Sequence, residues 1–227
     1  MAVRLSDGAR TLADVALAEL REAIVSGQIA PGSPIRLHEY VDRLNMSSVP
    51  IREALRFLEQ KGLIERTPHR GVYVAAMSAR DLDDTYQIRL DLESRAVRLA
   101  AEAMTEEDGI RIRSLVQDYA RASLAGDPAA RDLHGNIHMS LYELSRSKWL
   151  LLLLPMLWDN SERYRRLSLP LRGTPEQRIE EHQLIVEACA SGEADNAEAL
   201  LRTHLSNSFE AAIKSLRDNE KLDQEAP

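Results

Sequence analysis

Four histidines in the second part of the chain have the residue type and the spacing to hold a metal ion: His134, His138, His182 and His204. His134 and His138 are four residues apart, so on one helix their imidazoles lie on the same face about 6 Å apart, a distance that one ion can bridge. His182 and His204 each lie roughly ten residues from Gly192, so on two antiparallel helices joined there they can lie level. This spacing predicts a metal site in a helical bundle. The alternative is that the histidines only hydrogen-bond within the bundle.

The chemistry of such a site follows from its donor atoms. Imidazole ligands suit zinc, nickel or cobalt better than magnesium or calcium, so the expected cofactor is a divalent ion, zinc or nickel. Four imidazoles leave two positions of an octahedral ion open for water or a carboxylate, whereas a tetrahedral zinc ion would have none. The single cysteine, Cys189, excludes a multi-cysteine zinc site and an internal disulfide framework.

Two arginines in the first part of the chain have the spacing to contact DNA. Arg52 and Arg56 are four residues apart on a predicted helix that starts near Ser47, so they share one face. The opposite face carries an apolar stripe made of Ile51, Leu55 and Leu58. A guanidinium in this place can bind phosphate or the edge of a guanine through two hydrogen bonds. The alternative is that Arg52 pairs with a nearby glutamate on a solvated surface.

The elements that must position these arginines are short. Periodicity and turn residues predict a first helix over about 9–26, a second that closes at Asn45, and the third that starts near Ser47. Two short strands follow, over 63–66 and 72–74, on either side of a tight turn. Two helices, a turn, a third helix and a hairpin make a winged helix-turn-helix, whose third helix enters the major groove.

From Ser78 onward the sequence predicts only helices. They are expected at 79–103, 106–125, 127–146, 148–168, 175–191 and 194–217. Pro155 should kink or break the fourth of these, and the apolar run around it is too short to cross a bilayer. The fold class is therefore mainly α, with a winged helix-turn-helix domain at 1–76, an all-helical domain at 77–217 and a flexible tail at 218–227.

Composition and charge agree with a two-domain globular protein. The chain has 227 residues, of which 44% are hydrophobic and 29% charged, with a formal net charge of -7. Residues 1–75 hold ten Lys or Arg and nine Asp or Glu, so the acidity belongs to the rest of the chain. This mild positive balance is only a weak electrostatic indication of DNA binding. The N-terminal residues lack the apolar run of a secretory signal, so we expect a cytoplasmic protein with no membrane partner.

The N-terminal motifs resemble the GntR family of bacterial transcriptional regulators over about 10–76. The similar stretches are Pro-Gly at 31–32, SSVPIREALRFLEQKGLIE and HRGVYV. In that family the third helix usually opens with Ser-Arg-Thr-Pro-Val-Arg-Glu-Ala-Leu. Ser48 stands where the family has arginine, which implies a weaker electrostatic contribution to DNA binding and leaves the exact operator open. The resemblance implies a DNA-binding set of Arg52, Ser47, Ser48, Arg56, Arg70, Gly71 and His38, where His38 is otherwise an ordinary surface histidine.

The helical part, from about 80 to 215, resembles the FCD effector domain of the FadR-like branch of that family. The similar stretches are YQIRLDLESRAVRLAA, NIHMSLYELSRSKWL and EHQLIVEACASGEADNAEALLRTHL. Metal-binding members use three histidines and an aspartate, and His134 occupies the place of that aspartate. This departure implies either a four-histidine site or a site with a changed use. The resemblance also places Arg89 and Tyr86 at the effector pocket, where Arg89 could bind a carboxylate; its alternative partner is Glu93.

Together these features predict a ligand-responsive DNA-binding transcriptional regulator, expected to be a repressor. Its helical domain would bind the metal and a small organic acid and would form a homodimer, which reads an inverted repeat in double-stranded DNA. One alternative is a metal sensor without an organic effector. Another is a metal-dependent enzyme, but the spacing ties no general base to the histidines, because Glu181 beside His182 lies on a neighbouring helix face. We therefore expect that the chain is not an enzyme.

Overall fold

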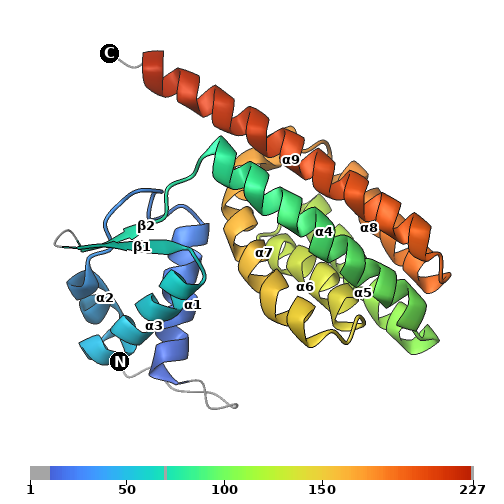
Figure 1. Ribbon diagram of the computed structural model, residues 1–227, viewed down its shortest axis with the longest axis horizontal. Coiled ribbons are helices and arrows are strands. Elements are labelled where there is room, and N and C mark those ends of the chain that lie inside the picture. The colour runs from blue at the N-terminus through green and yellow to red at the C-terminus, as the bar shows by residue number, and fades with distance from the viewer. Residues whose placement is uncertain (1–10, 69–70, 226–227) are drawn as a thin grey trace. The chain divides into compact units, whose positions relative to one another are not determined.

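The computed structural model describes residues 11–68 and 71–225 (Figure 1). The chain divides into two compact units. The first comprises Met1–Ser78 together with Asp159–Arg166, and the second comprises Ala79–Trp158 and Leu167–Pro227. The main division lies two residues beyond the expected domain boundary at 76.

The first unit has the order of elements predicted for a winged helix-turn-helix. They are α1 (Leu12–Val25), α2 (Leu37–Leu44), α3 (Ser48–Gln60), β1 (Ile64–Thr67) and β2 (Gly71–Val74). A capping box between Thr11 and Asp14 starts α1, because each residue's side chain satisfies the other's backbone N–H. The two strands are antiparallel, with Ile64 opposite Val74. This hairpin is the wing.

The core of the first unit fixes which face of α3 is free. Ile51 and Leu58 of α3 are fully buried, and Leu55 of the same stripe is nearly so. The helix packs against α1, whose Leu20 is also fully buried. Burial of such aliphatic side chains stabilises the fold by about 1.5–3 kcal/mol each. The opposite face of α3 is therefore left to solvent.

The second unit is a helical bundle. Its elements are α4 (Ala79–Ala103), α5 (Glu106–Ala125), α6 (Ala130–Glu143), most of α7 (Lys148–Ser168), the short helix η1 (Leu169–Leu171), α8 (Pro175–Ala190) and α9 (Ala194–Glu225). The most extensive contacts between helices join α4 to α9 and α5 to α8, and α4 and α9 run side by side in Figure 1. Capping boxes start α5, between Thr105 and Asp108, and α8, between Thr174 and Gln177. None of the helices in the described part of the chain is long and apolar enough to cross a membrane.

The structure differs from the expected helices in two places. The break at Pro155 is absent, since α7 continues through it. Proline removes one N–H donor, but Leu150 and Leu154 of the turn before it bury their side chains in the core and hold that part of the helix in place. The flexible tail at 218–227 is helical as far as Glu225. Its residues are mostly good helix formers, and extending an existing helix is far easier than starting one.

A single cysteine lies in the core of the second unit. Cys189, on α8, is 1% exposed. Burial raises the pKa of its thiol to about 12. The thiol is therefore a small apolar core group and not a reactive centre.

The turn before α8 gives a first testable prediction. Gly173 has φ of 75°, and a Cβ at this position would lie 2.5 Å from Oε1 of Gln177. That oxygen accepts a hydrogen bond from the N–H of Thr174 at 2.9 Å. In Gly173→Ala the amide must turn away, so we expect a loss of about 1 kcal/mol in the free energy of unfolding beyond the backbone strain. Urea denaturation measures it.

Gly126→Ala is the matched control for that substitution. Gly126 has φ of 67° and also follows a helix, but nothing lies within 4 Å of its added Cβ. It therefore carries the backbone strain without the collision. Equal losses in the two variants would contradict the role given to Gln177.

Candidate metal centre and nucleic-acid interface

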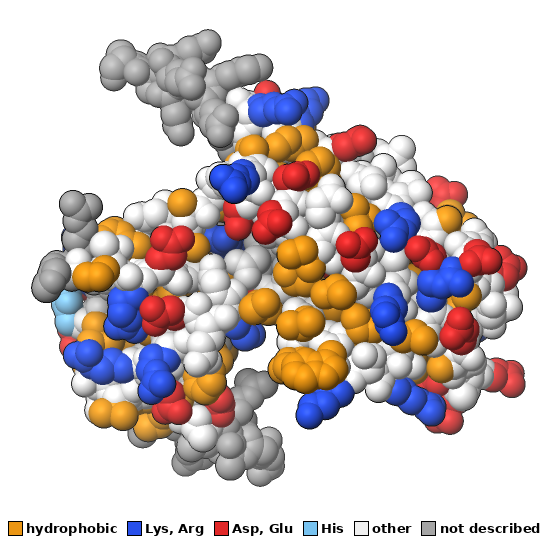
Figure 2. Space-filling model, viewed as in Figure 1, with side chains coloured by type: hydrophobic (Ala, Val, Ile, Leu, Met, Phe, Trp, Pro, Cys, Tyr) orange, Lys and Arg blue, Asp and Glu red, His pale blue; other side chains and the backbone are white. Residues whose placement is uncertain are grey.

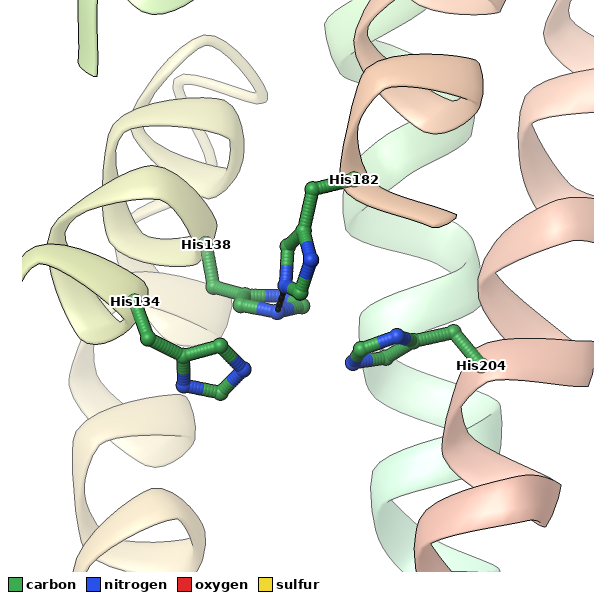
Figure 3. A group of neighbouring side chains, drawn as sticks. All are labelled: His134, His138, His182 and His204. Atoms are coloured by element: carbon green, nitrogen blue, oxygen red, sulfur yellow. Dashed lines mark hydrogen bonds between the residues drawn. The ribbon is translucent and has the colours of Figure 1, made fainter. Parts of the chain in front are cut away.

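The structure brings the four predicted histidines together (Figure 3). His134 and His138 come from α6, His182 from α8 and His204 from α9. All four are buried, and one nitrogen of each lies within 4.8 Å of the others. Their imidazoles point toward a common centre in Figure 3. The antiparallel arrangement of the last two helices places His182 and His204 level, as the spacing predicted.

The hydrogen bonds of two histidines fix their tautomers. Nδ1 of His182 lies 2.5 Å from the carbonyl oxygen of Arg178. Nδ1 of His204 lies 2.8 Å from a carboxylate oxygen of Glu181. A carbonyl and a carboxylate only accept hydrogen bonds, so both Nδ1 atoms must carry the proton. In the neutral rings, each Nε2 then presents a lone pair.

A buried chain of polar groups fixes His138 in the same way. Tyr142 donates its O–H to Glu93 and lies 3.0 Å from Nδ1 of His138. Because the phenol has only one proton to give, its oxygen must accept the proton on Nδ1 of His138. Arg89 donates to the same carboxylate from Nε at 2.6 Å. The Nε2 of His138 therefore also presents a lone pair.

Two of these lone pairs face each other. Nε2 of His138 lies 3.1 Å from Nε2 of His182, along the dashed line in Figure 3. Two acceptors at this distance repel unless a proton or a cation lies between them. Burial lowers the pKa of His182 to about 3, helped by the neighbouring His204, so protonation at neutral pH does not remove the conflict. The pair has the arrangement of two ligands of one ion.

The carboxylates next to the histidines are each paired with an arginine. Burial alone would raise the pKa of Glu181, but hydrogen bonds from His204 and Arg172 outweigh it and lower the pKa to about 2. Glu93 is fully buried and pairs with Arg89, whose two nitrogens reach it at 2.6 and 3.3 Å. Each carboxylate is thus offset by the positive charge of an arginine. Burial lowers the pKa of both His182 and His204, so these two rings add no positive charge at neutral pH.

The structure shows Arg89 with the alternative partner, Glu93. Its guanidinium is 4% exposed and also lies over the rings of Tyr86 and Trp158, at 4.8 and 5.3 Å. Tyr86 is buried beside it. An effector carboxylate would have to share Arg89 with Glu93, and effector binding by Arg89 and Tyr86 stays a prediction.

On the first unit, arginines surround a hollow on the free face of α3. Arg52 and Arg56 are exposed, and they line an open pocket of about 310 Å³ with Glu59 and Arg66. Arg66, on β1, donates to Glu59 at 3.2 Å. Figure 2 shows Lys and Arg side chains gathered over this unit, interleaved with acidic ones. Three guanidiniums on a helix and its wing form a surface that suits a phosphate backbone and the base edges beside it.

The other predicted DNA contacts have mixed placements. Ser47 is exposed at the N-cap of α3 and makes no side-chain capping bond, whereas Ser48 is half-buried. His38 is exposed on α2. Gly71 has φ of 103° at the start of β2, a conformation that glycine adopts without strain. Arg70 lies outside the described residues.

Some residues around the two sites were missed in the sequence. Tyr142 stands four residues after His138, a spacing that could have shown it. Glu181 was considered only beside His182, but it contacts His204 on α9. Arg172 had no local signal, because its partners lie on α8 and α9. Arg66 could have been found by placing the wing strand next to α3.

Both parts of the chain are similar to known protein families. Residues 12–74 match the model for bacterial regulatory proteins of the gntR family, and residues 84–207 match that for the FCD domain. The chain is 29% identical to the HTH-type transcriptional regulator BphR of Paraburkholderia xenovorans, over 88% of this chain and 84% of that protein. It is 28% identical to the HTH-type transcriptional repressor RspR of Escherichia coli, over 88% of each chain.

Solved structures show the same fold. E. coli McbR/YncC has a TM-score of 0.79 and 22% identity, covering 91% of this chain and 99% of that one. A GntR regulator from Rhodococcus sp. RHA1 has a TM-score of 0.70 and 22% identity, covering 89% and 97%. The two family matches together span both units. The chain belongs to the GntR family of DNA-binding transcriptional regulators and carries an FCD domain; it is a regulator and not an enzyme.

Proposed function

We propose that this regulator is controlled by a divalent metal ion and a small organic acid that bind at the four histidines. The observation that carries the proposal is the approach of two Nε2 lone pairs, on His138 and His182, to 3.1 Å. Two nitrogens at this separation can each lie about 2.1 Å from one ion. An ion between them turns a repulsion into two bonds.

The donor set limits which ion fits. His134, His138, His182 and His204 offer four neutral nitrogens, and the nearby carboxylates are held by arginines and point at other partners. Imidazole nitrogens favour zinc or nickel over magnesium or calcium. Trans ligands of one ion lie about 4.2 Å apart, so the group, now within 4.8 Å, needs only a small contraction to bind it.

The charge around the histidines favours an acidic effector. Glu181 is offset by Arg172 and Glu93 by Arg89, so a bound divalent ion would keep its full charge of two. An uncompensated charge in a buried site is costly. A small organic acid with two carboxylates supplies the two missing negative charges and can occupy the coordination positions that four imidazoles leave open on an octahedral ion. Arg89 and Tyr86 are the proposed contacts for its far end.

We also propose that the chain acts as a homodimeric repressor on an inverted repeat. One reading helix contacts few base pairs, and a twofold dimer doubles the contacts. The relative RspR is described as a repressor, which supports the same role here. Arg52, Arg56 and Arg66 are the proposed contacts to DNA, with Ser47, Gly71 and Arg70 beside them.

Metal removal and return test the metal requirement. Protein treated with a chelator and then given zinc at about 100 times its dissociation constant should gain about 2.7 kcal/mol in the free energy of unfolding. For a chain of this size the melting temperature should rise by roughly 5–10 °C. Magnesium at the same concentration is the control and should have little effect. Equal melting curves with and without zinc, and no stoichiometric ion in the pure protein, would refute the proposal.

One assay separates the effect of the metal from that of the acid. Operator binding is measured with zinc alone, with citrate or malonate alone as carboxylate probes, and with zinc and the acid together. A response to the acids that requires zinc supports the proposed function. A response to zinc alone, with none to the acids, supports the alternative of a metal sensor.

A further inference from the structure

We infer that Glu181 and Arg172 are positioning residues that hold His204 with its Nε2 toward the metal. The inference rests on the proposed metal site, because it says how one ligand of that site is kept ready. Nδ1 of His204 donates to Glu181 at 2.8 Å. Nη2 of Arg172 also lies near this Nδ1, but at 3.5 Å, so the shorter contact to Glu181 sets the ring as the tautomer with a lone pair on Nε2.

Glu181 is itself fixed by three further donors. Arg172 donates to both of its carboxylate oxygens, from Nη1 at 3.1 Å and from Nη2. Asn207 donates its side-chain N–H to Oε1 at 2.9 Å. With the bond from His204 the carboxylate accepts four hydrogen bonds, so its orientation is fully determined. A carboxylate held in this way holds the imidazole in turn.

Arg172 ties the connection between α7 and α8 to α9. It is 8% exposed. Nε donates to Oγ of Ser208 at 3.0 Å, and Nη2 donates to the carbonyl oxygen of His204 at 3.1 Å. Arg172 therefore contacts both the carboxylate that holds the ring of His204 and the backbone of the same residue. Glu181 and Arg172 thus hold both the ring and the backbone of His204, and we call this pair of residues the clamp.

The support of His204 differs from that of His182 and His138. A carbonyl accepts the proton on Nδ1 of His182, and a phenol accepts that of His138. Of these three acceptors, Glu181 is the charged one, and a carboxylate partner makes the imidazole a stronger ligand. An open pocket of about 660 Å³, lined by Arg172, Glu181 and Asn207 among others, lies outside the clamp and gives this carboxylate access to water. The strength of His204 as a ligand thus depends on Glu181.

The test replaces the carboxylate by an amide. In Glu181→Gln the side chain can donate as well as accept, and the pairing with Arg172 is lost. His204 is then free to carry its proton on Nε2, which blocks the metal. We expect the zinc affinity to fall by about 10–100-fold. In the metal-free protein, ¹⁵N–¹H correlation spectra of the imidazoles should show His204 shifting from the Nδ1–H to the Nε2–H tautomer.

Glu187→Gln is the matched control on the same helix. Glu187 accepts two hydrogen bonds from Arg113, both at 2.7 Å, but it is exposed. The control therefore breaks an Arg–Glu pair of the same kind without affecting His204. It should leave both the zinc affinity and the imidazole spectra unchanged. Identical behaviour of the two variants would overturn the inference.

Glu181→Asp keeps the test decisive if Glu181→Gln does not fold. Aspartate retains the charge for Arg172 but is one methylene too short to reach His204 as Glu181 does, so the same tautomer shift is expected. The spectra of the metal-free wild type also separate the two proposals. An Nδ1–H tautomer at His204 without any zinc binding would refute the metal site and leave the clamp. Zinc binding with an Nε2–H tautomer in the wild type would refute the clamp alone.

Discussion

The double variant His138→Ala, His182→Ala is expected to lose the metal entirely, from one divalent ion per chain to none. The two substitutions remove the nitrogens that lie 3.1 Å apart and leave one ligand on α6 and one on α9. A complete set of four ligands binds zinc with roughly 10 kcal/mol or more, and half a set does not compete with ordinary buffers. Elemental analysis of the purified variant measures the loss.

The control for this variant is His38→Ala. His38 is an exposed histidine on α2 and contributes nothing to the buried group, so the metal content should stay at one per chain. Circular dichroism of the metal-free proteins shows whether the double variant keeps its helices. If it does, its operator binding should no longer respond to zinc or to a chelator. A double variant that retains one ion per chain would place the metal elsewhere.

Replacing Arg52 by alanine is expected to weaken operator binding by about 1–3 kcal/mol, or roughly 5–150-fold at constant salt. Arg52 is exposed on the face of α3 opposite the buried stripe and shares its hollow with Arg56 and Arg66. A guanidinium there can form two hydrogen bonds with a guanine, and alanine forms none. Fluorescence anisotropy with a fragment of the operator measures the change.

Two further variants show whether Arg52 reads a base. Arg52→Lys keeps the charge but cannot form the paired hydrogen bonds, so its affinity should fall between those of wild type and Arg52→Ala. Arg121→Ala removes an exposed arginine of α5 that pairs with Asp118, and it should bind as the wild type does. Unchanged affinity in Arg52→Ala would remove this residue from the interface.

Local signals allowed most of the fold to be predicted. The bounds of α4, α5 and α7 agree with those expected, because hydroxyl caps, capping boxes and glycines act within one turn of the helix end. In the wing, β1 lies one residue later than expected, and β2 starts one residue earlier and ends as expected. The continuation of α7 through Pro155 and the length of the last helix were not predicted, because local signals do not determine them. Whether a helix survives a proline, or extends past its last apolar residue, depends on packing and on elongation, and no single residue reports either.

The metal centre was only partly visible in the sequence. His134 and His138 follow from the helical period, and the pairing of His182 with His204 follows from the turn between two helices. Their supporting groups do not follow, since Arg172, Glu181 and Ser208 are brought together by three segments whose rotation about their axes the sequence does not state. The same holds for Glu93, which reaches His138 through Tyr142. Spacing finds ligands on one helix, and tertiary packing sets what lies behind them.

The buried thiol of Cys189 gives the second unit an internal reporter of its own stability. With a pKa of about 12, only about one thiol in 100,000 is ionised at pH 7, and the sulfur is shielded by the core as well. An alkylating reagent can react only during the brief openings in which α8 separates from its neighbours. The rate of modification at this one atom therefore counts those openings, and their frequency measures the local unfolding free energy of the bundle.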